Sequence, residues 1–235
     1  MANGRKVATK SADLRDFITR LDVDVVGIVN LSEWKETELE KTALKLLPQT
    51  HSVVVFAMEI FPEFLDLTSP KTIMGAPPMN DLIASHIDFL NSRLVRAGYD
   101  LTRTLHHLGL KALPLPGRGC PVDERFLKPV FSFKQAAHAA GLGKIGWNSL
   151  LITPAFGPRV RLAACLTEAE LESTTPVDMT LKCESCGICV KRCSSGALSQ
   201  PQNSATYSMN KFACKSYRSP SGGCFECMRS CPVGR

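Results

Sequence analysis

The chain has 235 residues, of which 44% are hydrophobic and 21% charged, and its formal net charge is +6. No apolar stretch approaches the roughly 18 residues that a membrane-spanning helix needs, so we expect no contact with a membrane. The cations form neither a run of five like charges nor a basic stripe interleaved with aromatic residues, which argues against a DNA-binding protein. A chain of this length allows one larger α/β domain and one small domain.

The first part of the chain alternates helical and strand patterns. A helix capped by Ser11 carries apolar residues at helical spacing, and residues 23–29 follow as a β-branched strand. A second helix over residues 36–47 ends at Pro48, and residues 51–58 then indicate a strand that is buried on both faces. The apolar positions of the first helix are Leu14, Phe17, Ile18 and Leu21.

The middle of the chain continues this pattern. After a proline-bearing loop at residues 69–78, a long helical pattern covers residues 80–108 and is closed by Gly109. Residues 110–115 indicate a short strand that prolines interrupt, residues 133–140 an apolar helix and residues 150–152 another short strand. These elements predict an α/β domain over residues 1–175, followed by a small domain over residues 176–235.

Eight of the ten cysteines lie in the small domain, as the runs Cys183-x2-Cys186-x2-Cys189-x3-Cys193 and Cys214-x9-Cys224-x2-Cys227-x3-Cys231. A 4Fe–4S cluster needs four thiolates, and a tight C-x2-C-x2-C turn supplies three of them. In two-cluster ferredoxins the last cysteine of each run ligates the other cluster. We therefore expect one cluster on Cys183, Cys186, Cys189 and Cys231, and a second on Cys193, Cys214, Cys224 and Cys227.

Zinc and disulfide bonds are the alternatives for these cysteines. Paired C-x2-C spacings also form zinc sites, but a structural zinc uses two pairs, whereas the first run packs four sulfurs within eleven residues. Disulfides need an oxidising compartment, and the basic N-terminus lacks the apolar segment of a secretion signal, so we expect a cytoplasmic protein. Of the two isolated cysteines, Cys165 in the apolar stretch LAACL is expected to be a buried small hydrophobe. Cys120 is either an exposed loop thiol or a residue that reaches a cofactor, and we assign it no function.

A glycine-rich segment lies between the apolar helix and the strand at residues 150–152. Gly141, Gly143 and Gly146 formally match the G-x-G-x-x-G motif of dinucleotide-binding proteins. The segment follows a helix and precedes a strand, however, which is the reverse of the order that this motif requires, so we exclude NAD binding. Glycines here permit the close approach of a large flat ligand or of the neighbouring domain, with Trp147 available to stack.

The order of motifs around this segment resembles a known family. Residues 131–134 (FSFK), 140–154 (AGLGKIGWNSLLITP) and 156–162 (FGPRVRL), followed by the cysteine runs, are similar to epoxyqueuosine reductases and corrinoid-dependent reductive dehalogenases. Upstream, Leu47-Pro48 and residues 52–55 (SVVV) fit the same pattern. The resemblance implies an α/β (α+β) nitroreductase-like domain followed by a small two-cluster ferredoxin-like domain.

The same resemblance implies cofactors and partners. The cofactors are two 4Fe–4S clusters and a base-off cobalamin, and a low-potential electron donor of the ferredoxin or flavodoxin type would reduce the clusters. The substrate is not implied. The residues implied to contact the corrinoid are Phe131, Ser132, Lys134, Gly141, Gly143, Ile145, Gly146, Trp147 and Asn148.

The proton donors of the family have no counterpart in register, so no catalytic residue is assigned. Where epoxyqueuosine reductases carry an aspartate before the AGLG motif, this chain has Leu127. The tyrosine of the dehalogenases has no clear match among Tyr99, Tyr207 and Tyr217. Beside a cobalamin-dependent reductase, two hypotheses therefore stand: an electron-transfer protein that docks a partner such as a corrinoid protein, and a redox or oxygen sensor. A pocket between residues 131–134, the glycine segment and the first cysteine run would favour the reductase, and an exposed apolar patch beside a cluster would favour docking.

Overall fold

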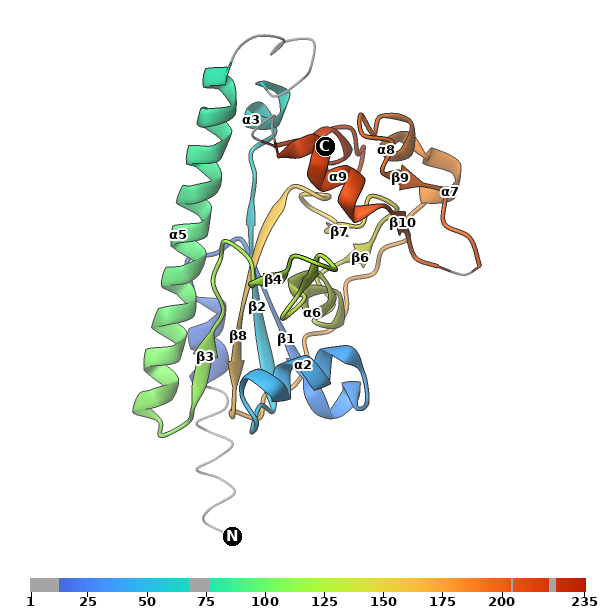
Figure 1. The fold of residues 1–235 in the computed structure, drawn as a ribbon. Helices are drawn as coiled ribbons and strands as arrows, with labels where there is room; N and C mark the ends of the chain where they lie inside the picture. The colour runs from blue at the N-terminus through green and yellow to red at the C-terminus, as the bar shows by residue number, and fades with distance from the viewer. Residues whose placement is uncertain (1–12, 68–76, 204, 220–222) are drawn as a thin grey trace.

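The computed structural model describes residues 13–67, 77–203, 205–219 and 223–235 (Figure 1). Its centre is a four-stranded sheet in the order β1-β2-β8-β3, in which every neighbouring pair is antiparallel. The strands are β1 (Val25–Asn30), β2 (Ser52–Glu59), β8 (Val160–Thr167) and β3 (Ala112–Pro114). The expected mixed α/β fold is confirmed, with antiparallel pairing throughout this sheet.

Helices cover both faces of the sheet (Figure 1). On one face the long helix α5 (Pro77–His107) packs on β8, β3 and β2, and the helical residues 13–19 join the same hydrophobic core. On the other face lie α6 (Phe133–Ala139) and α2 (Glu38–Leu46), which share the second core. None of the helices in the described ranges is long and apolar enough to cross a bilayer.

Strand β2 is buried on both faces, as the sequence predicts. Its residues alternate between the two cores, because successive side chains of a strand point to opposite faces. Val53 and Val55 belong to the core under α6, whereas Val54 and Phe56 belong to the core under α5, and all four are fully buried. A strand of β-branched and aromatic residues between two helical layers needs no polar face.

The remaining elements are short. The α/β part also contains η1 (Leu31–Trp34), α3 (Pro62–Leu67) and two small hairpins, β4 (Val122–Asp123) with β5 (Lys128–Pro129) and β6 (Lys144–Ile145) with β7 (Leu151–Ile152). The cysteine-rich part contains α7 (Cys183–Cys186), α8 (Ile188–Lys191), α9 (Lys211–Arg218), α10 (Glu226–Arg229) and the hairpin of β9 (Leu198–Ser199) with β10 (Ser208–Met209).

Most expected elements are present, with shifted ends. Helix α2 begins two residues later than predicted because the side chain of Thr37 caps it by accepting a hydrogen bond from the Glu40 N–H. Helix α5 begins at Pro77, inside the segment expected to be a loop, and Gly109 closes it with a left-handed φ of +77°. The rest of that loop and Ser11 lie outside the described residues. Strand β8 was not anticipated as an element, although its Cys165 is buried as expected.

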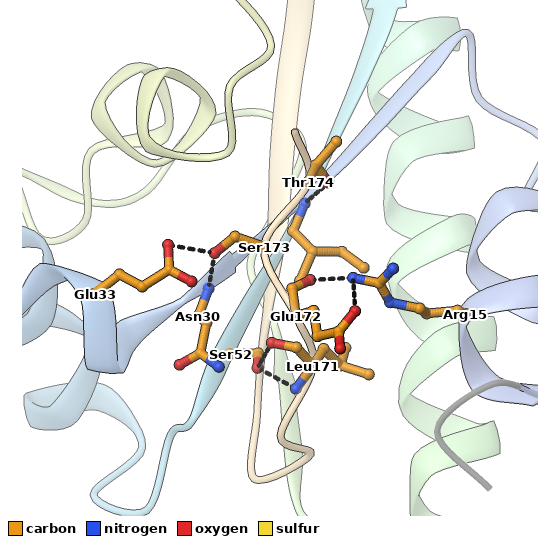
Figure 2. A network of polar contacts seen from close by, with 9 residues as sticks. Arg15, Asn30, Glu33, Ser52, Leu171, Glu172, Ser173 and Thr174 are labelled. Atoms are coloured by element: carbon orange, nitrogen blue, oxygen red, sulfur yellow. Dashed lines mark hydrogen bonds and ion pairs between the residues drawn. The ribbon is translucent and has the colours of Figure 1, made fainter. Parts of the chain in front are cut away.

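A segment that crosses the end of the sheet connects β8 to the cysteine-rich part (Figure 2). The Leu171 N–H donates to Ser52 Oγ (2.9 Å), and further along the edge strand β1 donates from the Asn30 N–H to Ser173 Oγ (2.9 Å). Thr174 exchanges two hydrogen bonds with Ile28, at 2.8 and 3.0 Å. These bonds pair the otherwise open edge of β1, so the crossing segment is fixed to the sheet.

The tail after α10 returns to the α/β part. A Cβ added at Gly157 would lie 2.0 Å from the carbonyl oxygen of Val233, so the two backbones touch. The guanidinium of Arg159, only 2% exposed, donates to the carbonyl oxygen of Gly234 and lies 3.9 Å from Glu59. The boundary predicted at residue 175 stays a prediction, because contacts of this kind tie the two parts together.

Candidate functional site

The first three cysteines of the first run and the last cysteine of the second run surround one small cavity of about 100 Å³. Helices α7 and α8 are separated by Gly187, whose left-handed φ of +56° turns the chain tightly enough to bring the first three thiols together. Burial, followed by the neighbouring thiol of Cys183, raises the pKa of Cys189 to about 11. The four cysteines that line the cavity are Cys183, Cys186, Cys189 and Cys231.

The other four cysteines form a second group. Burial raises the pKa of the Cys214 thiol on α9, Arg218 lowers it, and the neighbouring thiols of Cys224 and Cys193 raise it further. Burial raises the pKa of Cys227 on α10 to about 12, with the thiols of Cys224 and Cys214 as the next causes. The cavity gathers the first set of four that the spacing predicts, and the thiols of the second set influence one another's pKa values. The ligation of both sets stays a prediction.

The donor set fits a cluster better than a single ion. All ten cysteines are free thiols, so no disulfide is formed. Four thiolates on one zinc, at a Zn–S distance of about 2.3 Å, would lie about 3.8 Å from one another. Across the described ranges, no group of three or more His, Cys, Asp or Glu side chains is arranged to hold a single metal ion. A four-iron cube holds its thiolates farther apart, as four cysteines around a shared cavity allow.

A larger cavity of about 590 Å³ lies between the α/β part and the cysteine-rich part. Its walls include Phe131, Ser132, Phe133 and Lys134 at the start of α6, as well as Leu127 of the β4–β5 hairpin. The side chain of Lys215 on α9 forms an ion pair with Glu124 of the same hairpin, so α9 closes one side. The volume lies in the range of about 300–1,000 Å³ that is typical of small-molecule sites.

The charged lining of this cavity is mostly basic. It comprises Arg118, Lys128, Lys134 and Lys211 against the carboxylate of Glu38. Lys128 lies 3.2 Å from Glu38, and Arg118 lies 3.3 Å from Asp88 outside the cavity. Cys120 also lines it; the thiol is 9% exposed, so Cys120 is not an exposed loop thiol, and burial raises its pKa.

Lys134 contacts Tyr207, a residue to which no role could be assigned from the sequence. Its Nζ lies 3.0 Å from the hydroxyl oxygen of Tyr207, 2.7 Å from Ser149 Oγ and 3.0 Å from the Ser149 carbonyl oxygen. The same Nζ lies 4.2 Å from the centre of the Tyr207 ring. Residues 73 positions apart are joined here, and no local pattern in the sequence signals such a pair.

The glycine segment packs against the chain itself. A Cβ at Gly141 would lie 2.5 Å from Pro176 Cα, one at Gly143 2.1 Å from the Ile152 carbonyl oxygen, and one at Gly146 2.3 Å from the Ile152 side chain. Ile145 is buried in the adjacent β6. Close packing within the chain therefore accounts for the three glycines. Contact of this segment with a corrinoid stays a prediction.

The residues expected around one pocket divide between two cavities. Phe131, Ser132 and Lys134 line the 590 Å³ cavity, whereas Trp147 and Asn148 line the 100 Å³ cavity with the thiols. The two cavities share no lining residue. Asn148 and Ser149 lie between the two cavities. The Asn148 amide lies 3.5 Å from the carbonyl oxygen of Cys227, and Ser149 contacts Lys134 of the larger cavity.

No protein-family model matches the chain. The tetrachloroethene reductive dehalogenase of Desulfitobacterium hafniense is 31% identical over 154 residues, which cover 65% of this chain and 24% of that protein. The epoxyqueuosine reductase of Bacillus subtilis is 29% identical over 243 residues, which cover 98% of this chain and 60% of that protein. The chain thus spans between a quarter and three fifths of these relatives.

Solved structures agree with these sequence matches. The structure of the Bacillus subtilis epoxyqueuosine reductase has a TM-score of 0.63 at 20% identity, covering 97% of this chain and 66% of that one. A reductive dehalogenase whose structure suggests a mechanism for B12-dependent dehalogenation has a TM-score of 0.65 at 18% identity, covering 94% of this chain and 31% of that one.

The fold and the site define a class of proteins in which a mixed α/β part is followed by a cysteine-rich, ferredoxin-like part. The sequence and structural matches agree on one group within that class. In sequence and in fold, this chain is similar to epoxyqueuosine reductases and reductive dehalogenases.

Proposed function

We propose that this chain is an iron–sulfur reductase that binds two 4Fe–4S clusters and a cobalamin, and that it reduces a substrate not yet identified. The observation that carries the proposal is the gathering of four thiols around one cavity, where Cys231 of the second run joins Cys183, Cys186 and Cys189 of the first. Two adjacent clusters at the surface of a ligand-binding domain are an arrangement for moving single electrons to a reaction centre.

The thiols would hold the clusters in the crossed arrangement. Cys183, Cys186, Cys189 and Cys231 would hold the first cluster, and Cys193, Cys214, Cys224 and Cys227 the second. Cluster binding requires the thiolate form, so the iron must displace the thiol protons even where burial raises the pKa of the cysteine, as at Cys189 and Cys227. Trp147 and Asn148 would shield the first cluster from water, because both line its cavity.

The cobalamin would lie against the 590 Å³ cavity in a nitroreductase-like domain. Its apolar wall at Phe131 and Phe133 suits a flat macrocycle, and its basic lining at Lys134 and Lys211 suits a ligand with an anionic tail. A corrinoid with its nucleotide tail is larger than this cavity, so part of it would lie across the open mouth. When bound, a cobalamin supplies the low-potential cobalt chemistry that side chains lack.

Electrons would come from a low-potential donor of the ferredoxin or flavodoxin type. Helices α7 and α8 and their flanks expose Lys182, Lys191 and Arg192 beside the first cluster, against the carboxylate of Glu184. A basic rim of this kind attracts an acidic donor and raises its rate of encounter.

An anaerobic titration of the reconstituted protein with hydroxocobalamin, followed by its visible spectrum, tests the proposal. We expect binding near one equivalent with the spectral change of a base-off corrinoid, in a protein that carries two clusters by iron and sulfide count. Two clusters without cobalamin binding would refute the corrinoid part, and zinc or no metal at the cysteines would refute the whole.

One observation favours a second candidate, an electron-transfer protein that docks a partner. Phe212 on α9, which carries Cys214, is 53% exposed, and Phe126 on the β4–β5 hairpin is 65% exposed. Large exposed aromatic side chains beside a redox centre are typical of a docking surface. Under this alternative the protein would reduce a separate corrinoid protein, and Phe212→Ser would slow that reduction while leaving reduction by dithionite unchanged.

A further inference from the structure

A buried arginine next to the thiol cavity has hydrogen-bond donors without acceptors. Arg159 is only 2% exposed, and a guanidinium has five N–H donors. Its Nη2 donates to the Gly234 carbonyl oxygen, whereas within the described ranges neither Nε nor Nη1 has a hydrogen-bond partner. A buried charge is costly unless an opposite charge and hydrogen bonds compensate it. We therefore expect a negative group beside Arg159.

Glu59 compensates this charge only in part. Its Oε1 lies 3.9 Å from Arg159 Nη2, which is beyond hydrogen-bonding distance. Burial raises the pKa of Glu59, and the Arg159 cation lowers it. The neighbouring carboxylates of Asp24 and Glu63 raise it again. The contact with Glu59 is made through Nη2, so the donors at Nε and Nη1 are left for another acceptor.

The tail of the chain brings Arg159 to the first group of cysteines. Val233 lines the thiol cavity together with Cys231, and a Cβ at Gly157 would lie 2.0 Å from the Val233 carbonyl oxygen. Arg159 follows Gly157 by two residues and contacts Gly234, so it lies against the same stretch of the tail. Burial raises the pKa of Cys231 and a hydrogen bond from the Val233 backbone lowers it; the neighbouring thiols raise it, and the Arg159 cation lowers it. The positive charge of Arg159 thus acts on a predicted cluster ligand.

The charges near an iron–sulfur cluster influence how readily the cluster accepts an electron. Reduction adds one negative charge to a centre that its thiolates already make negative, and hydrogen bonds, net charge and solvent exposure set the potential. A cation stabilises the reduced form more than the oxidised form, and this effect is larger in a buried site, where water screens charges poorly. Arg159 has both properties that such an effect requires, because it is buried and because a guanidinium stays protonated in proteins.

We propose that Arg159 raises the reduction potential of the first cluster, and that this cluster is the negative group that the buried guanidinium lacks. The inference rests on the proposed function, which places the first cluster at Cys231 and the first three cysteines of the first run. The electron comes from the external low-potential donor, which is oxidised as the cluster is reduced. No bond forms or breaks at Arg159, and its protonation does not change. The reduced cluster is more stable beside Arg159, so electrons are retained there until the ligand accepts them.

An anaerobic potentiometric titration of the reconstituted protein with dithionite, followed by electron paramagnetic resonance, tests this inference without a substrate. We expect Arg159→Gln to lower the midpoint potential of one cluster by the equivalent of about a tenfold change in the reduction equilibrium, or about 59 mV for one electron. Glutamine can still donate to the Gly234 carbonyl oxygen, so this variant retains a contact with the tail. Arg159→Lys keeps the charge and should keep most of the potential. Arg103→Gln is the matched control, because it removes an exposed cation near the C-terminal end of α5, far from the cysteine-rich part (Figure 1).

The sign of the shift separates an effect of charge from a structural effect. If Arg159 only held the tail in place, its loss would admit water to the cluster, which stabilises the more negative reduced form and raises the potential. Glu59→Gln removes a carboxylate that opposes Arg159 and leaves the arginine in place, so it should raise the midpoint.

Several results would overturn the inference while the proposed function stands. One is an unchanged or raised midpoint in Arg159→Gln, and another is an equal fall in Arg159→Lys or in Arg103→Gln. If Arg159→Gln does not assemble its clusters, an unchanged or lowered midpoint in Glu59→Gln decides against the inference. Failure of the unmodified protein to bind two clusters, measured by iron and sulfide content, would instead count against the proposed function.

Discussion

Substitution of Gly141 and of Gly109 by alanine tests whether the close contact between Gly141 and Pro176 matters for stability. Both have left-handed φ values, +73° and +77°, but a Cβ at Gly109 meets nothing within 4 Å, whereas one at Gly141 lies 2.5 Å from Pro176 Cα. An alanine at either position carries the left-handed penalty of about 1–2 kcal/mol. To restore an ordinary contact of 3.4 Å, the backbone at Pro176 must also move by about 0.9 Å in Gly141→Ala. Overpacking of this kind costs about a further 1–3 kcal/mol.

The two variants should therefore differ measurably in urea. With an m-value of about 2 kcal/mol/M, Gly141→Ala should unfold at about 0.5–1.5 M less urea than Gly109→Ala, in anaerobic samples followed by tryptophan fluorescence. The amide of Val177, which donates to the Gly141 carbonyl oxygen at 2.9 Å, should also exchange faster with deuterium in Gly141→Ala only. Equal urea midpoints and equal Val177 exchange would refute the argument that the glycine exists to admit the crossing segment.

Three further outcomes are expected. Cys231→Ala should lose about half of the iron and one of the two signals in electron paramagnetic resonance, and two intact clusters would show that Cys231 is not a ligand. Trp147→Ala should shorten the lifetime of the first cluster in air several-fold, measured by the loss of visible absorbance, because Trp147 lines the thiol cavity; an unchanged lifetime would contradict a shielding role. Burial raises the pKa of Cys165 to about 11, so iodoacetamide at pH 8 should label it about 100-fold more slowly in the folded protein than in urea, as mass spectrometry can measure. The contribution of this thiol to stability is complete below its unfolded pKa of about 8.5 and declines as the pH rises toward 11. Labelling of the folded protein as fast as of the unfolded protein would contradict the burial of Cys165.

The core elements of the fold are predictable because their residues carry a local pattern. Strand β2 and helix α2 show the periodicity of their own structure, and Pro48 marks where α2 must end. Strand β8 has the same buried character, but arginine and alanine interrupt its β-branched residues, so its place beside β2 follows only from pairing with distant residues. The ends of elements moved where a side-chain cap decided them, as at Thr37.

The candidate site divides in the same way. The cysteine groups could be predicted because ligand spacing is a local property that iron–sulfur chemistry constrains tightly. The pairing of Lys134 with Tyr207 could not, because it joins the start of α6 to the residue before β10. The glycine segment was expected to face a ligand or the neighbouring domain, and the structure shows it against Pro176 and Ile152. A glycine in a sequence indicates a close approach without identifying what approaches.

Under the proposed function, the attachment of the cysteine-rich part to the sheet has a consequence for the rate of electron transfer. Thr174 fixes its beginning to β1, whereas the Asn148 amide contacts the Cys227 carbonyl and Arg159 contacts Gly234 near its end. A part held at both ends cannot swing as a carrier between a donor and an acceptor. Electron tunnelling, which falls steeply with separation, would then occur over fixed distances within the molecule. The rate of turnover would then depend on the arrival of the external electron donor and on the entry of the ligand.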